Sequence, residues 1–177
     1  MRNKFLIICY TFFFNSMLIA ENVKIESKNI TIDKNKQTTV FKDEVIVKTY
    51  DNNIIQSDYA EYNRNTGFIK LMNNIKAIDA KKNIIETKNA EYSEKTKIFK
   101  SYGFTKIITS ENYIIEGTNI VFNNQRKSIP SDNKDTIVDQ EGNKVSMENF
   151  SYQTDNNIFK SIGLIKIKDK TGNDYEF

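Results

Sequence analysis

Acidic residues at a repeated spacing are the first candidates for chemistry in this sequence. Glu61 and Glu91 are separated by 30 residues, and each directly precedes a tyrosine. Two carboxylates can hydrolyse a glycosidic bond when one acts as the acid and the other as the nucleophile or base. The next position in the series is Val121, so the acid does not recur. A solvent-facing acid beside an inward aromatic is the simpler interpretation, and a β-helix carbohydrate-active enzyme stays as an alternative.

The other common catalytic groups are missing from the sequence. The chain has 177 residues, no histidine and a single cysteine, Cys9. It therefore lacks a Ser–His or Cys–His nucleophile system and an imidazole metal ligand. Two of its 26 basic residues, Arg2 and Lys4, lie in an N-terminal targeting segment, which leaves 24 basic against 23 acidic residues. We expect no enzymatic activity, no cofactor, no metal site and no nucleic-acid partner.

An apolar stripe with a period of 30 residues dominates the sequence. Tyr62 is followed at this interval by Tyr92, Phe122 and Tyr152. Three further series keep the same period: Ile55, Ile85, Ile115, Val145; Ala60, Ala90, Ile120, Phe150; and Ile69, Phe99, Ile129, Phe159. A fixed period of this size is typical of stacked units that bury their apolar faces against their neighbours. The units are 23–52, 53–82, 83–112, 113–142 and 143–172. The sequence stops inside a sixth unit, so a fragment of a longer protein and a complete chain stay as alternatives.

Each unit is expected to contain strands and no helix, because apolar residues alternate with a period of two. Ser57 and Ala60 are three residues apart, an odd number, so a regular strand would send their side chains to opposite faces. A bulge or corner would return both to the interior, and the same step recurs at Thr87/Ala90, Gly117/Ile120 and Met147/Phe150. Polar turns are predicted at 63–67, 93–97, 123–127 and 153–157.

A second bend is predicted at Asn73, Gly103, Asn133 and Gly163, because asparagine and glycine tolerate positive φ. The fourth unit departs from the pattern. Asp135 replaces the Ile75 and Ile165 of other units, and Pro130 removes a backbone donor, so a loop or frayed edge is expected there.

The first twenty residues are interpreted as a secretory signal peptide. Arg2 and Lys4 precede an apolar run from residue 5 to residue 14, which is shorter than the ~20 residues of a membrane span. An uncleaved membrane anchor is the alternative. Residues 21–177 are expected to form one exported domain, without disulfides once Cys9 is removed with the segment.

The repeat resembles a known family. The pattern N-I-I-x-S/T-x-x-A-E-Y occurs at 53–62 and 83–92, and the first copy continues as I-K-L-M-N-N-I-K-A-I-D. Together with the signal segment, these units are similar to the OstA-like repeats of lipopolysaccharide transport proteins. That family includes the periplasmic bridge protein LptA and the N-terminal periplasmic domain of LptD, with LptC as a lesser option. The resemblance covers residues 23–172.

The resemblance implies an all-β fold, a β-jellyroll of stacked short strands with an open apolar groove. It implies a periplasmic module that carries lipopolysaccharide towards the outer membrane and holds the lipid A acyl chains in the groove. It also implies head-to-tail contacts with other Lpt proteins through edge strands. The alternative is a structural surface repeat protein with a closed interior. The candidate groove residues are Ile55, Ala60, Tyr62, Ile69, Leu71, Ile85, Ala90, Tyr92, Phe99, Ile115, Ile120, Phe122, Val145, Phe150, Tyr152 and Phe159.

Overall fold

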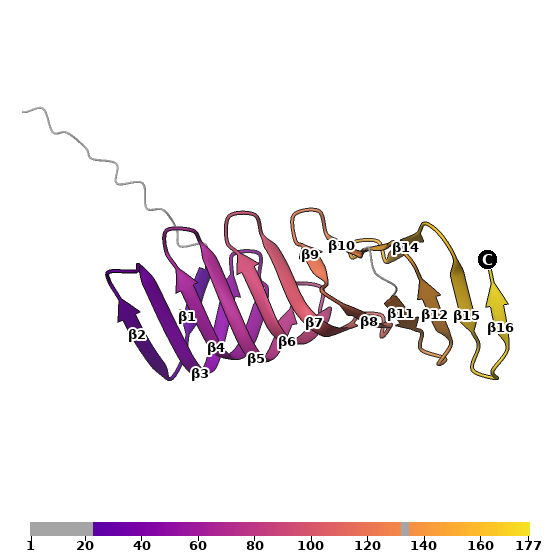
Figure 1. Ribbon diagram of the computed structural model, residues 1–177, viewed down its shortest axis with the longest axis horizontal. Coiled ribbons are helices and arrows are strands. Elements are labelled where there is room, and N and C mark those ends of the chain that lie inside the picture. Colours follow the sequence, from indigo (N-terminus) through magenta and orange to yellow (C-terminus); the bar gives the residue numbers. More distant parts are fainter. Residues whose placement is uncertain (1–22, 132–134) are drawn as a thin grey trace, which may run out of the picture.

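The structure, a computed structural model, describes residues 23–131 and 135–177, and within these ranges it consists of antiparallel strands without helices (Figure 1). The predicted signal peptide and Asn133 lie outside the described residues. The strands are β1 (Val23–Glu26), β2 (Asn29–Asp33), β3 (Thr38–Thr49), β4 (Ile54–Asn63), β5 (Phe68–Ile78), β6 (Ile84–Ser93), β7 (Ile98–Ile108), β8 (Ile114–Thr118), β9 (Val121–Asn123), β10 (Ser128–Ser131), β11 (Asp135–Val138), β12 (Lys144–Met147), β13 (Phe150–Gln153), β14 (Ile158–Ser161), β15 (Ile165–Lys168) and β16 (Asp174–Glu176).

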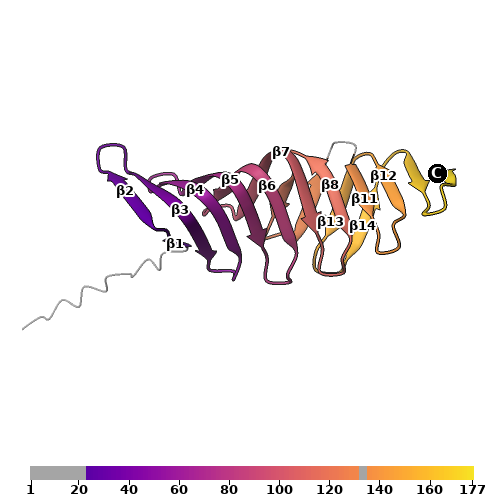
Figure 2. The ribbon, with the colours of Figure 1, turned by 90° about the horizontal axis from the view of Figure 1, so that it is seen from below.

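The strands form two walls that face each other, and Figure 2 shows β13 and β14 lying behind β8, β11 and β12. Wall 1 follows the order β1-β3-β4-β5-β6-β7-β8-β11-β12-β15-β16. Wall 2 follows β2-β3-β4-β5-β6-β7-β9-β10-β13-β14. The strands β3 to β7 pass through both walls, whereas the later strands are short and belong to one wall each. The predicted all-β jellyroll of stacked strands is therefore confirmed.

Bends in the middle of the long strands join the two walls along one side of the stack. The strand register shifts between Gln56 and Tyr59 on β4, which is the corner predicted from the odd spacing of apolar residues. On β5 and β7 the chain turns at Asn73 and Gly103, with φ of 63° and 82°. These are the residue types that accept left-handed backbone without a large steric cost, as the sequence predicted.

Polar turns form the opposite side of the stack, which we call the seam. The wall 2 turns are residues 34–37, 64–67, 94–97, 124–127 and 154–157, and the wall 1 turns are 50–53, 79–83, 109–113, 139–143 and 169–173. Each wall 2 turn bonds to the one before it through Arg64 N–Gln37 O at 3.1 Å, Glu94 N–Gly67 O at 2.9 Å, Asn124 N–Lys97 O at 3.1 Å and Thr154 N–Lys127 O at 2.8 Å. The turns thus continue the antiparallel ladder along the edge of the stack.

Three of the five wall 1 turns, 79–83, 139–143 and 169–173, are held by an aspartate and an asparagine four residues apart. Asp79 accepts hydrogen bonds from the backbone and side-chain nitrogens of Asn83 at 2.9 and 2.7 Å. The pair Asp139 and Asn143 repeats this arrangement. The Oδ1 of Asn83 also accepts a bond from the backbone of Ser110 in the next turn, at 2.9 Å. Side chains therefore supply both the turn geometry and the link between neighbouring turns.

The fourth unit is more regular than the sequence predicted. Pro130 lies within β10 and pairs opposite Ser151 of β13, while β9 pairs with β10 at Ser128, before the proline. The missing donor of Pro130 is thus tolerated where the strand has a neighbour on one side. Asp135 starts β11 and is buried. The expected loop is therefore wrong for these two positions, and residues 132–134 lie outside the described part of the chain.

A parallel β-helix is contradicted by the structure, because the strand pairs of the described residues are antiparallel. Glu61 and Glu91 lie on the outer face of wall 2, on either side of Lys70. Each accepts a hydrogen bond from an outer-face tyrosine, Glu61 from Tyr59 and Glu91 from Tyr102. These carboxylates belong to a mixed-charge surface and do not face the interior.

Candidate functional site

The inner face of wall 1 carries an unbroken aliphatic row. Its residues pair with one another from strand to strand in the order Val47, Ile55, Ala77, Ile85, Ile107, Ile115, Ile137, Val145 and Ile167. The row forms because each strand alternates inward and outward residues and the hairpins keep the register constant. An apolar surface therefore runs along the length of the stack.

The facing row on wall 2 is mainly aromatic. Tyr62, Ile69, Tyr92, Phe99 and Phe122 pair in this order. Ile129, Tyr152 and Phe159 continue the row on β10, β13 and β14.

Two ring contacts lie at the C-terminal part of this row, and one of them joins the two walls. The rings of Tyr152 and Phe159 stack with centroids 4.4 Å apart. Phe159 also meets Tyr113, which lies in a wall 1 turn, edge-to-face at 5.8 Å. Aromatic contacts of this geometry stabilise packing beyond the area that they bury.

The structure brings all the predicted groove residues together in the interior. Most of them are buried side chains of the core, with Ile69, Leu71, Ile115 and Tyr152 fully enclosed. Tyr62, Val145 and Phe159 are half-buried and pack against this core. Sequence reasoning left out Val47, Ala77, Ile107 and Ile137, although they form a further series with the same period of 30 residues.

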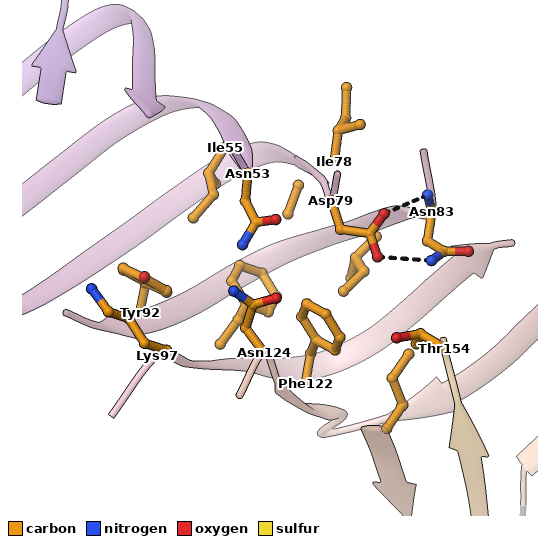
Figure 3. Close-up of a pocket in the computed structure, with 14 residues that line it drawn as sticks. Asn53, Ile55, Ile78, Asp79, Asn83, Tyr92, Lys97, Phe122, Asn124 and Thr154 are labelled. Atoms are coloured by element: carbon orange, nitrogen blue, oxygen red, sulfur yellow. Dashed lines mark hydrogen bonds between the residues drawn. The ribbon is translucent and has the colours of Figure 1, made fainter. Parts of the chain in front are cut away.

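A small cavity lies between the walls at the seam (Figure 3). Wall 1 contributes Ile55 and Ile85 to its lining, and wall 2 contributes Phe99, Phe122 and Ile129. The space inside holds about one water molecule. An acyl chain can therefore occupy this part of the interior only when the walls move apart.

Polar side chains line the rim of this seam cavity. Lys97 and Tyr92 are drawn at one end of the cavity, with Asn53 and Asn124 between that end and Thr154 (Figure 3). Asn53 and Tyr92 are almost fully buried, with 8% and 2% of their surface exposed. The rim thus combines polar atoms with an apolar floor.

Side-chain contacts close the seam from wall to wall. Asn124 of a wall 2 turn donates a hydrogen bond to the carboxylate of Asp51 in a wall 1 turn at 2.9 Å. The ammonium of Lys81 donates to the backbone oxygens of Thr154 and Asp155 at 3.2 and 2.6 Å. We call these two contacts, together with the bond from the Asn157 amide to the Glu111 carboxylate, the seam contacts. They join turns that are more than forty residues apart in the sequence.

Two interior tyrosines are held in their neutral form. Burial, reinforced by the carboxylates of Asp51 and Glu94, raises the pKa of Tyr92 to about 12. Thr49 lies close enough to lessen this shift without forming a hydrogen bond of normal geometry. Burial also raises the pKa of Tyr152 to about 12. Both phenols therefore remain hydrogen-bond donors at neutral pH.

Both ends of the stack expose apolar side chains. At the N-terminal end, a pocket is lined by Val23, Ile25, Phe41 and the exposed Ile30 and Ile32. At the C-terminal end, Ile162, Leu164, Tyr175 and Phe177 are exposed. Neither end of the described stack is covered by a polar cap of the kind that closes many repeat proteins.

The part of the chain that the structure describes contains no helix long and apolar enough to span a membrane. Within the same residues, no group of acidic or cysteine side chains gathers in a way that would hold a metal ion.

Comparisons with solved structures give distant likenesses. LptH of Pseudomonas aeruginosa, the LptA-homologous periplasmic component of the lipopolysaccharide transport device, is 11% identical, with 78% of this chain and 80% of that chain covered and a TM-score of 0.30. The TCP10 domain of Danio rerio CPAP, solved with a STIL peptide, is 9% identical, with 86% and 97% covered and a TM-score of 0.18. These TM-scores are too low to support an argument. No curated protein sequence matches the chain.

The family comparison is decisive. The profile of the family described as "Lipopolysaccharide-assembly, LptC-related" matches residues 20–130, which is more than half of the chain. The predicted relationship to lipopolysaccharide transport proteins is thereby confirmed, while the choice of LptA or LptD stays a prediction. This chain belongs to the LptC-related family of lipopolysaccharide-assembly proteins.

Proposed function

We propose that this protein binds lipopolysaccharide by its acyl chains between the two walls and conducts it across the periplasm towards the outer membrane. Membership of the lipopolysaccharide-assembly family supports the role, which needs no enzymatic step in this chain. The observation that carries the proposal is the continuous apolar interior, in which wall 1 offers an aliphatic row from Val47 to Ile167 without a polar interruption. Similar surroundings at each unit would let an acyl chain move along the stack.

The energetics are compatible with a ligand that opens the interior. Each methylene group removed from water contributes about 0.8 kcal/mol, so ten methylenes contribute about 8 kcal/mol. A hydrogen bond between side chains contributes roughly 0.5–1.5 kcal/mol. The few seam contacts are therefore weaker in sum than the burial of one long acyl chain, provided that the core residues exchange contacts with each other for contacts with the lipid.

The partners proposed are other Lpt proteins, joined end to end. The edge strands β1 and β2 at one end, and β14 and β16 at the other, have backbone groups available for pairing on their outer side. The exposed Ile30 and Leu164 would be covered by such a partner. Export by the N-terminal segment would place the domain in the periplasm.

Photo-crosslinking to lipopolysaccharide tests the proposal. A photoreactive phenylalanine analogue is placed in turn at Tyr62, Phe122 and Phe159, which lie at the N-terminal end, the centre and the C-terminal part of the wall 2 row. Two matched controls lie on the outer surface: Tyr102, an exposed aromatic on β7, and Lys88, an exposed residue on β6. Adducts are expected at the three interior positions and not at the controls.

The structural surface repeat is the competing function, and it predicts a different result. Its interior would serve as a core only, so variants shown by circular dichroism to be folded would give no adduct at any interior position. Equal adducts at Tyr102 and Phe122 would also contradict the proposal, because they would mean that lipid associates with the surface.

A further inference from the structure

Three buried polar atoms at the seam cavity lack partners among the described residues. They are the Oδ1 of Asn53, the hydroxyl of Tyr92 and the Nζ of Lys97, and all three side chains line the same cavity. Asn53 comes from wall 1, whereas Tyr92 and Lys97 come from wall 2. Buried polar groups are hydrogen-bonded in nearly all folded proteins, so a cluster of unpaired groups around one cavity can receive a polar ligand.

Lys97 is the most informative of the three. Burial of an ammonium group without a counter-charge carries a large desolvation cost. Two carboxylates act on the neighbouring Tyr92, and each already accepts a hydrogen bond: Asp51 from the amide of Asn124, and Glu94 from the hydroxyl of Tyr62. The Oδ1 of Asn124 accepts the ammonium of Lys127 at 2.7 Å, so it too is engaged. The Nζ of Lys97 has no hydrogen-bond partner among the described residues, so this donor is available to a group that enters the cavity.

The hydrogen-bonding types of the three groups define the chemistry of the ligand. Lys97 can only donate, and the neutral Tyr92 donates as well. The Oδ1 of Asn53 accepts. A phosphate monoester that retains one hydroxyl can accept from the two donors and donate to the acceptor. Its second pKa is near 6, so both ionisation states are present around neutral pH.

The floor of the cavity defines the rest of the ligand. Ile55, Ile85 and Phe122 continue from the polar rim into the aliphatic and aromatic rows of the two walls. We infer that Lys97, Tyr92 and Asn53 form a binding site for the phosphate monoester group of a lipid whose alkyl or acyl chain lies along these rows. This inference rests on the proposed function, since the chain must enter between the walls for the phosphate to reach the rim.

Binding of alkyl phosphates tests the inference. The full chain is titrated at pH 7.4 with decyl phosphate and with decanol, both below their micelle concentrations, and with inorganic phosphate. Binding is followed by calorimetry and by phosphorus NMR. Decyl phosphate is expected to bind about tenfold more tightly than decanol, as one charge-assisted hydrogen bond would give. The variant Lys97→Met is expected to bind both ligands with the affinity of decanol.

A matched control separates the site from general charge effects. Lys100→Met removes the same charge from an exposed position three residues away, on the outer face of β7 opposite Glu91. This variant should keep the preference for decyl phosphate. Lys97→Met should fold normally, because it replaces a half-buried ammonium without a hydrogen-bond partner by an apolar side chain of similar length. An unchanged denaturation midpoint checks this.

Each other result has a defined meaning. Equal binding of decyl phosphate and decanol overturns the inference and leaves the proposed function intact; the cavity then holds a water molecule. A preference that survives in Lys97→Met overturns it as well, because the phosphate would be bound elsewhere. Inorganic phosphate that binds as tightly as decyl phosphate would identify a free-phosphate site and overturn the lipid assignment. Failure of both alkyl ligands to bind would refute the proposed function itself.

Discussion

Substitution of Lys81 by methionine is expected to strengthen the binding of an acyl ligand. Lys81 lies in a wall 1 turn, and its ammonium donates to two backbone oxygens of the facing wall 2 turn, at Thr154 and Asp155. Methionine keeps the length of the side chain and removes both bonds. Since these bonds exist only while the seam is closed, their loss favours the open state in which an acyl chain can enter.

The size of the effect follows from the contacts that are lost. Hydrogen bonds to a charged group contribute up to about 3 kcal/mol, but Lys81 is exposed, so about 1 kcal/mol is a better value for the pair. When the closed state dominates, the apparent affinity is proportional to the small open population. A change of about 1 kcal/mol then raises the affinity about fivefold.

The neighbouring Lys82 provides the matched control. It is exposed, carries the same charge and makes no side-chain hydrogen bond or ion pair with the described residues. Dissociation constants for a fluorescent acyl probe are measured for the wild type, Lys81→Met and Lys82→Met. Only Lys81→Met should bind more tightly. Equal affinities for the two variants, or weaker binding by Lys81→Met, would refute the idea that opening of the seam limits access to the interior.

Three further variants test the packing and ionisation of the interior. Phe122→Ala should lower the free energy of unfolding by about 3–5 kcal/mol, because Phe122 is buried. Phe104→Ala on the outer surface should change it by less than about 0.5 kcal/mol. Urea denaturation measures both values. Gly117→Ala should cost about 1–3 kcal/mol, because a Cβ at this position would lie 2.2 Å from the Asp135 carboxylate. Tyr92→Phe should resist alkaline unfolding. The pKa of Tyr92 is about 12 in the folded protein and about 10 in the unfolded chain, so ionisation favours the unfolded chain as the pH rises above 10. Phenylalanine has no proton to lose.

Each of these variants has a control. In the double variant Gly117→Ala/Asp135→Ala the new Cβ no longer meets the carboxylate. The double variant should therefore lose less free energy of unfolding than the two single variants lose in sum. Additive costs would mean that the close approach is not what requires glycine. Tyr50 is 79% exposed, so Tyr50→Phe should leave the alkaline transition unchanged. If it shifts the transition as much as Tyr92→Phe does, burial is not the cause.

The fold was predictable because it depends on local spacing. An apolar period of two indicates strands, and the odd step between Ser57 and Ala60 required a corner if both were to face inward. Asn73 and Gly103 marked the bends because few other residues accept positive φ. These signals recur in several units, so the irregular fourth unit did not hide them.

The closed state of the interior could not be predicted from the same signals. A stripe of apolar residues is equally compatible with a packed core and with an open groove, since both require inward apolar side chains. The distance between the walls depends on the seam contacts, and these join residues such as Asp51 and Asn124, 73 positions apart. Their pairing depends on the twist of the stack, which no local pattern specifies.

Lys97 was missed for a related reason. In the sequence it is the last residue of a polar turn, at the position of Gly67 and Asn157 in other units, and such a residue is expected to face solvent. Its backbone has φ of 56°, as at the end of the other wall 2 turns. The side chain lies over the seam because the facing wall 1 turn approaches there. The contact of Lys97 with the cavity thus depends on wall 1, which the local sequence around Lys97 does not specify.

The two sides of the stack differ in what an opening motion would break. On the bend side, strands β3 to β7 run continuously from one wall to the other, whereas side chains join the walls at the seam. The hydrogen bonds between successive turns run along each wall, not across the seam, as with Glu94 N to Gly67 O. Separation of the walls would therefore leave the backbone ladders intact and would expose the apolar rows unless a lipid replaced the lost contacts.

This asymmetry predicts a pattern of hydrogen exchange on binding of an acyl ligand. The amides of Glu94 and Asn124, bonded along wall 2 to Gly67 and Lys97, should keep their protection when lipid is bound. The side-chain amide of Asn124, which crosses the seam to Asp51, should exchange faster because its acceptor moves away. Exchange measured by NMR distinguishes the two nitrogens of the same residue. Loss of protection at the backbone amides would show that lipid unravels the turns, and the interior would then open by local unfolding and not by separation of intact walls.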